Sequence, residues 1–224
     1  MNHEIFLEIG QKKVLAGATD WPGWCRGGRS EEAAVQALVD YGPRYAAVMA
    51  AAGLEVTPPA GAAGFSVVER AAGNASTDYG VPDQPLASDA RPLEEAELAR
   101  LQTILSACWQ AFDRALAAVE GVELRRGPRG GGRQPDAMAR HVLESNVSYL
   151  GRLDWRLTLD ERAGVSEQIE GSRLATLDAL ARAARGEVPA LGPRGGKRWT
   201  PRYFARRAAW HVLDHLWEIE DRSL

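Results

Sequence analysis

Four long segments with helical periodicity follow residue 90, and they constrain the fold more than any other feature of the sequence. In each segment, apolar residues recur at intervals of three and four, which places them along one face of a helix. Proline begins three of the segments, at the helical position where its missing N–H is not needed. Almost no strand pattern interrupts them, so we expect an antiparallel four-helix bundle. The predicted helices cover residues 92–119, 135–153, 166–184 and 201–222.

The beginning of the chain has a different pattern, with short alternating runs and frequent glycine and proline. Residues 4–9 and 13–18 predict two strands around a turn, and residues 65–71 predict a third strand. Ser30, followed by two acidic residues, predicts the start of a helix. Pro43 is expected to break or bend that helix.

A polar stretch rich in glycine, proline and aspartate, residues 76–90, predicts a linker. The sequence therefore predicts an α+β protein with two domains. A small domain of β-sheet and helix is expected over residues 1–75, and the four-helix bundle over residues 91–224.

Composition excludes several classes of protein. The net charge of −3 argues against unspecific binding of nucleic acid, and no apolar run approaches the length that spans a membrane. The chain begins without the pattern of a signal peptide. The two cysteines, Cys25 and Cys108, are predicted to lie in different domains, so no disulfide framework is indicated and a cytoplasmic location is expected.

Three of the four histidines fall on predicted inward faces of the bundle helices. His211 and His215 are one helical turn apart within an apolar stripe, and His141 lies near the stripe of the second helix. Buried imidazoles need a partner, and a divalent metal ion is one. Three nitrogen ligands predict an open site that suits Zn or Ni, with Fe as a further option, and not Mg or Ca. The alternative is that the histidines only pack or form hydrogen bonds.

Carboxylates near these histidines in the sequence are candidates for proton transfer. Glu144 and Asp214 are the predicted catalytic residues, and Glu218 is a further candidate to hydrogen bond a ligand from behind.

Two loops rich in basic residues precede the second and fourth predicted helices. In a simple up-down-up-down bundle both loops would lie at one end and attract an anionic substrate, whereas a crossover would separate them. The alternative is a solvated charged surface. The basic residues are Arg125, Arg126, Arg129 and Arg133 in one loop, and Arg194, Lys197, Arg198 and Arg202 in the other.

The bundle region resembles the DinB/YfiT-like family of metal-binding four-helix bundles. The run W-H-V-L-D-H-L-W-E-I-E-D-R is similar to the last helix of that family, and His141, His211 and His215 match its histidine positions. The resemblance implies a divalent metal held by three histidines, often Zn or Ni. Members include thiol-cofactor-dependent transferases and a maleylpyruvate isomerase. It therefore implies a metal-dependent hydrolase or a thiol-dependent transferase, acting on a small molecule that is anionic or linked to a thiol cofactor.

The run D-W-P-G-W-C-R-G-G-R-S-E-E-A-A-V-Q-A-L resembles the HicB-like antitoxin domain, a small sheet with a helix on one face. In antitoxins that domain binds a toxin, but no DNA-binding element follows it here, so an accessory role in structure or dimerisation is expected. The alternative to an enzyme is a protein that binds a partner or a small ligand and has a structural or vestigial metal site. Matching residues are Asp20, Pro22, Gly23, Gly28, Ser30, Glu31 and Ala33.

Overall fold

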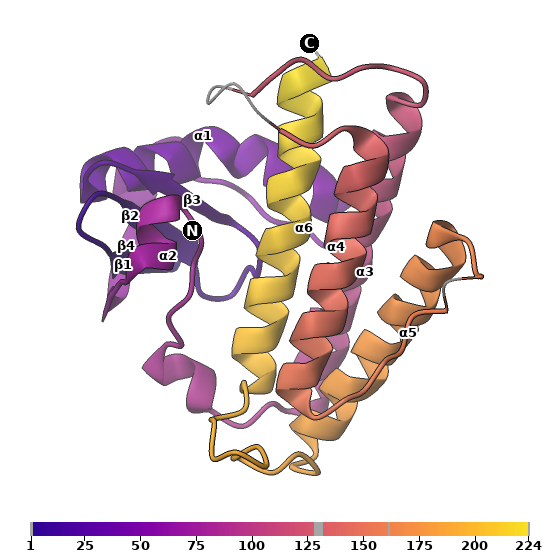
Figure 1. Cartoon of the computed structure of the whole chain (residues 1–224). Coiled ribbons are helices and arrows are strands. Elements are labelled where there is room, and N and C mark those ends of the chain that lie inside the picture. The colour runs from indigo at the N-terminus through magenta and orange to yellow at the C-terminus, as the bar shows by residue number, and fades with distance from the viewer. Residues whose placement is uncertain (1, 128–131, 161, 224) are drawn as a thin grey trace. The chain divides into compact units, whose positions relative to one another are not determined.

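The computed structural model describes residues 2–127, 132–160 and 162–223 (Figure 1). The chain forms two compact units, Met1–Arg91 and Pro92–Leu224. The first contains a four-stranded sheet and the second is helical, so the predicted α+β class is confirmed.

The sheet of the first unit has the order β3-β2-β1-β4. β1 is antiparallel to β2 and parallel to β4, and β2 is antiparallel to β3. Three strands match the predicted ones, whereas β3 was not predicted because glycine is uncommon in strands. The strands are β1 (His3–Ile9), β2 (Val14–Ala18), β3 (Cys25–Gly28) and β4 (Phe65–Ala72).

Glycine in β3 allows a helix to approach the sheet closely. A Cβ atom on Gly28 would lie only 2.3 Å from the backbone nitrogen of Ala34. Ala34 belongs to helix α1 (Glu31–Ala50), which packs on β3 and β2. Gly28 thus weakens the strand pattern of β3, but it also allows helix α1 to begin beside that strand.

Helix α1 begins as predicted, with the side chain of Ser30 accepting a hydrogen bond from the backbone of Ala33. It continues through Pro43, so the prediction of a break there is wrong. Burial compensates for the missing N–H: Leu38, Tyr45 and Met49 are fully buried. Tyr45 also donates its hydroxyl hydrogen to the carbonyl of Pro22 at 3.0 Å, which fixes the second half of the helix against the loop before β3.

The segment predicted as a linker folds onto the first unit. It contains helix α2 (Ala75–Tyr79) and the 3₁₀ helix Ala87–Ala90; a further 3₁₀ turn, Ala62–Gly64, precedes β4. The carboxylate of Glu8, buried on β1, accepts hydrogen bonds from the hydroxyl of Thr77 at 2.5 Å and from the backbone of Asp83 and Gln84 at 3.1 Å. These bonds tie the segment to the sheet, so the boundary between the units lies at residues 91–92.

The second unit consists of four long helices close to the predicted ones. Figure 1 shows α3 and α6 running in one direction and α4 and α5 in the other. The bundle therefore differs from a strictly antiparallel order, because residues 151–160 return along the bundle before α5 starts (Figure 1). The helices are α3 (Glu95–Ala118), α4 (Pro135–Leu150), α5 (Val165–Ala184) and α6 (Pro201–Ser223), with a 3₁₀ turn at Gly151–Leu153.

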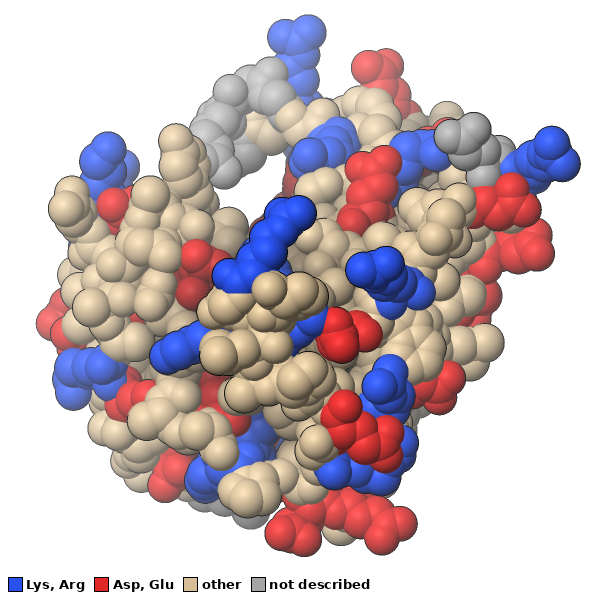
Figure 2. Space-filling model, turned by 60° about the horizontal axis from the view of Figure 1, so that its bottom comes forward, with Lys and Arg blue, Asp and Glu red and all other residues tan. Residues whose placement is uncertain are grey.

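This crossover separates the two basic loops, which lie at opposite ends of the helical unit (Figure 1). Several of their side chains bind protein oxygen atoms. Arg198 donates to the carbonyl of Gly151 at 2.6 Å, and Arg202 pairs with Glu97. On the face in Figure 2, basic and acidic side chains are interspersed. The two loops therefore do not form a single opening that would attract an anion. Arg129, in the first loop, lies outside the described residues.

Both cysteines are free and buried, and burial raises the pKa of the Cys108 thiol. Within the described ranges, no helix combines the length and the apolar character needed to cross a membrane.

We expect Glu8→Ala to lower the stability of the first unit by about 2 to 3 kcal/mol, because it leaves several donors without their charged acceptor. Urea unfolding followed by circular dichroism measures the change. Glu4→Ala is the matched control, since Glu4 is exposed on the same strand. Equal stability of the two variants would contradict the assigned role of Glu8.

Candidate metal centre

The three predicted ligands lie on two neighbouring helices that run in opposite directions. His211 and His215 are on α6, and His141 is on α4. Helix α6 begins as predicted, with Thr200 accepting a hydrogen bond from the backbone of Tyr203 and Pro201 in the first turn. The four-residue spacing then turns both α6 imidazoles toward α4.

The imidazoles of His141, His211 and His215 converge. One ring nitrogen from each lies within 4.8 Å of the others. Nε2 of His211 is 3.3 Å from Nε2 of His141. The ring centroids are 4.7 to 5.1 Å apart. The structure thus brings together all three histidines that the sequence singled out.

The separation between His141 and His211 fits a metal ion. With bonds of about 2.0 to 2.1 Å, two nitrogen ligands of a tetrahedral zinc ion lie about 3.3 to 3.4 Å apart. The distance between the two Nε2 atoms matches this value. Three imidazoles around one point also suit Ni and Fe, whereas Mg and Ca prefer oxygen ligands.

Burial keeps His211 and His141 neutral. It lowers the pKa of His211 to about 2 and that of His141 to about 4, and electrostatic repulsion from His215 is the next largest cause of both shifts. His211 and His215 are each 8% exposed, whereas His141 is half-buried. A neutral imidazole offers a lone pair to a metal at neutral pH without first losing a proton. The site is open to solvent at His141.

Glu218 orients one of the ligands from behind. Its carboxylate lies 3.1 Å from Nδ1 of His215, and this hydrogen bond is the main cause that lowers the pKa of Glu218. The bond leaves Nε2 of His215 for the site. Arg222 donates to the other carboxylate oxygen at 2.8 Å and to the carbonyls of Arg125 and Arg133. A chain of hydrogen bonds thus links the ligand to the loop before α4.

The other two predicted carboxylates take different positions. Glu144 is exposed on α4, and its charge raises the pKa of His141 against the effect of burial, so it lies close enough to act on the site. Asp214 is half-buried on α6. The hydrogen bond to a ligand comes from Glu218, and the catalytic roles of Glu144 and Asp214 stay predictions.

One aromatic and one basic residue beside the histidines were not predicted, Tyr149 and Arg207. The ring of Tyr149 is 5.7 Å from that of His211, and Arg207 lies over Tyr149 at 5.2 Å. Their spacing could have indicated them, because Arg207 is one turn before His211 and Tyr149 is about two turns after His141.

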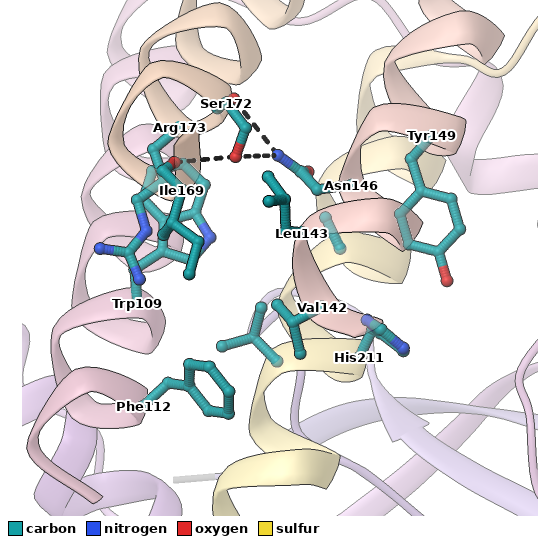
Figure 3. Close-up of a pocket in the computed structure, with 12 residues that line it drawn as sticks. Trp109, Phe112, Val142, Leu143, Asn146, Tyr149, Ile169, Ser172, Arg173 and His211 are labelled. Carbon is teal, nitrogen blue, oxygen red and sulfur yellow. Dashed lines mark hydrogen bonds between the residues drawn. The ribbon is translucent and has the colours of Figure 1, made fainter. Parts of the chain in front are cut away.

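A pocket inside the bundle adjoins the site. In Figure 3 the rings of His211 and Tyr149 point away from Trp109 and Phe112, which line the opposite side. Asn146 donates to the hydroxyl and carbonyl oxygens of Ser172, both at 3.2 Å. The lining is otherwise mostly apolar. His211 therefore stands between this pocket and the other two histidines.

No protein-family model, curated protein or solved structure matches this chain. The resemblances to the DinB/YfiT-like and HicB-like families therefore stay predictions from the sequence. What the site can do is argued from its geometry.

We expect Glu218→Gln to weaken zinc binding by about 10- to 100-fold, because an amide is a poorer partner for Nδ1 of His215. Competition with a chromophoric chelator measures the affinity. Glu144→Gln removes the same charge near His141 without breaking a hydrogen bond to a ligand, and it should have a much smaller effect. If both variants lose the same affinity, charge alone explains the result and the orienting role fails.

Proposed function

We propose that this protein is a metal-dependent enzyme, a hydrolase or a thiol-dependent transferase that acts on a small molecule in the cytoplasm. The observation that carries the proposal is that one ring nitrogen from each of three histidines lies within 4.8 Å of the others, with His141 only half-buried. His141, His211 and His215 are the proposed ligands, and Zn or Ni the proposed metal, with Fe as a further option.

Three protein ligands leave a coordination position for a substrate, which is typical of catalytic metal sites, whereas structural sites are closed by four ligands. A bound metal of this kind acts as a Lewis acid and lowers the pKa of water or of a thiol. The resemblance of the last helix to DinB/YfiT-like proteins supports the same class of chemistry.

The protein's own residues would position the ligands and move protons. Glu218 holds His215 through Nδ1, and Arg222 in turn holds Glu218. Glu144 is exposed three residues after His141, where its carboxylate could exchange protons with solvent. Asp214 is the second candidate for that role.

One observation favours a different function. The 3.3 Å contact between His141 and His211 is also the length of a hydrogen bond between two neutral imidazoles. Without a metal the same cluster would be a structural feature of the bundle. The protein would then bind a partner or a small ligand, with the sheet unit in an accessory role.

Metal analysis of protein purified without a histidine tag separates these functions. We expect about one equivalent of zinc or nickel, a melting temperature that rises with metal, and loss of both in His211→Ala. His3→Ala is the control, because His3 belongs to the first unit and binds the carbonyl of Thr57. Absence of metal together with unchanged stability of His211→Ala would support the non-enzymatic alternative.

Activity is tested on the metal-loaded protein with a panel of amides, esters and thiol adducts. We expect turnover that is lost after chelation and restored by the metal. His141→Ala should abolish it by removing a ligand, while the circular dichroism spectrum stays unchanged. Turnover that survives chelation would contradict the proposal.

A further inference from the structure

One basic residue beside the histidines is held in an unusual environment. Arg207 lies on α6, one turn before His211. Its guanidinium group is stacked over two rings, 4.6 Å from the centroid of Trp210 and 5.2 Å from that of Tyr149. Such stacking holds the planar group in a fixed orientation and leaves its N–H edges for other partners.

Two of its donors have no hydrogen-bond partner among the described residues. Arg207 is only 9% exposed, and its Nε and Nη1 atoms are buried and donate to none of those residues. Buried donors of a charged group are costly when they are left unpaired. By contrast, Arg173 binds Asp113 and Arg222 binds Glu218 within the same unit. An unpaired guanidinium in this bundle therefore indicates a ligand that completes it.

The position of Arg207 connects it to the candidate metal centre. The ring of Tyr149 contacts both its guanidinium and the imidazole of His211. The charges of Arg207 and Arg133 both lower the pKa of His211, so positive charge lies close to the cluster. A negatively charged group would be stabilised here whether or not a metal ion is bound.

We propose that Arg207 binds a carboxylate of the substrate, next to the group that reacts at the three-histidine site. This inference rests on the proposed function and narrows its substrate class to small carboxylic acids. Arginine donors match the two oxygens of a carboxylate. A carboxylate carries one negative charge, which a single guanidinium balances, whereas inorganic phosphate carries up to two at neutral pH and would leave charge unpaired in a buried position.

Fluorine NMR with trifluoroacetate as the probe tests this assignment. We expect saturable binding to the metal-free protein and to the cobalt-loaded protein, with paramagnetic broadening only in the second case. Acetate should displace the probe, whereas trifluoroacetamide, which has no charge, should not bind. Inorganic phosphate should compete more weakly than acetate, and stronger competition by phosphate would overturn the choice of carboxylate.

Substitution locates the binding group. Arg207→Gln should weaken probe binding about tenfold or more, because it removes the charge-assisted hydrogen bonds. Arg207→Lys, which keeps the charge but loses the planar edges, should bind with intermediate affinity. Arg140→Gln is the matched control, since Arg140 is exposed on α4 next to His141 in the sequence. Circular dichroism and zinc affinity without the probe check that each variant is folded.

The outcomes separate this inference from the proposed function. A protein that binds no metal but binds the probe through Arg207 would refute the enzyme and keep the carboxylate site. Probe binding that is equal in wild type and Arg207→Gln would overturn the inference. So would an absence of saturable binding, because water alone would then satisfy the buried guanidinium.

Discussion

The packing of α4 against α6 in opposite directions is the constraint on which the site depends. Because the helices are antiparallel, residues that follow His141 on α4 meet residues that precede His211 on α6, and Tyr149 reaches Arg207. A shift of one turn along either helix, about 5.4 Å, would separate the imidazoles beyond the reach of a single metal ion. The apolar stripe of α6 therefore fixes the site as well as the bundle.

The crossover between α4 and α5 has a second effect on the helical unit. It places α5 beside α4 in parallel, where Asn146 bonds to Ser172 and Thr176. The contact between Asn146 and Ser172 lies at the interior pocket, which His211 also lines (Figure 3). Helix α4 thus packs on α5 through Asn146 and supplies His141 to the cluster of histidines.

Much of this could be predicted from the sequence, since helical periodicity gave all four bundle helices and the spacing of the histidines indicated their convergence. The errors have physical causes. Pro43 was expected to break or bend a helix, but α1 continues through it because tertiary burial of Leu38 and Met49 outweighs its lost hydrogen bond. Strand β3 was hidden by glycines that a neighbouring helix requires. Helix direction depends on the path of a connection, which local patterns do not encode.

At the site, the sequence predicted the three histidines but not which residues contact them. Spacing along one helix identifies ligands, but the partners of those ligands come from other elements. Glu218 was among three carboxylates near enough in sequence, and only the structure shows which of them meets His215. Arg207 is recognised only when the burial of its donors is known.

The hydrogen bonds of Arg222 have a consequence for how the centre could respond to its surroundings. Through Arg222, the backbone of the loop before α4 is connected to Glu218 and from there to Nδ1 of His215. The electron-donating strength of that imidazole therefore depends on the conformation of a surface loop. A molecule that rearranged the carbonyls of Arg125 and Arg133 would change the electron-donating strength of His215 without entering the site.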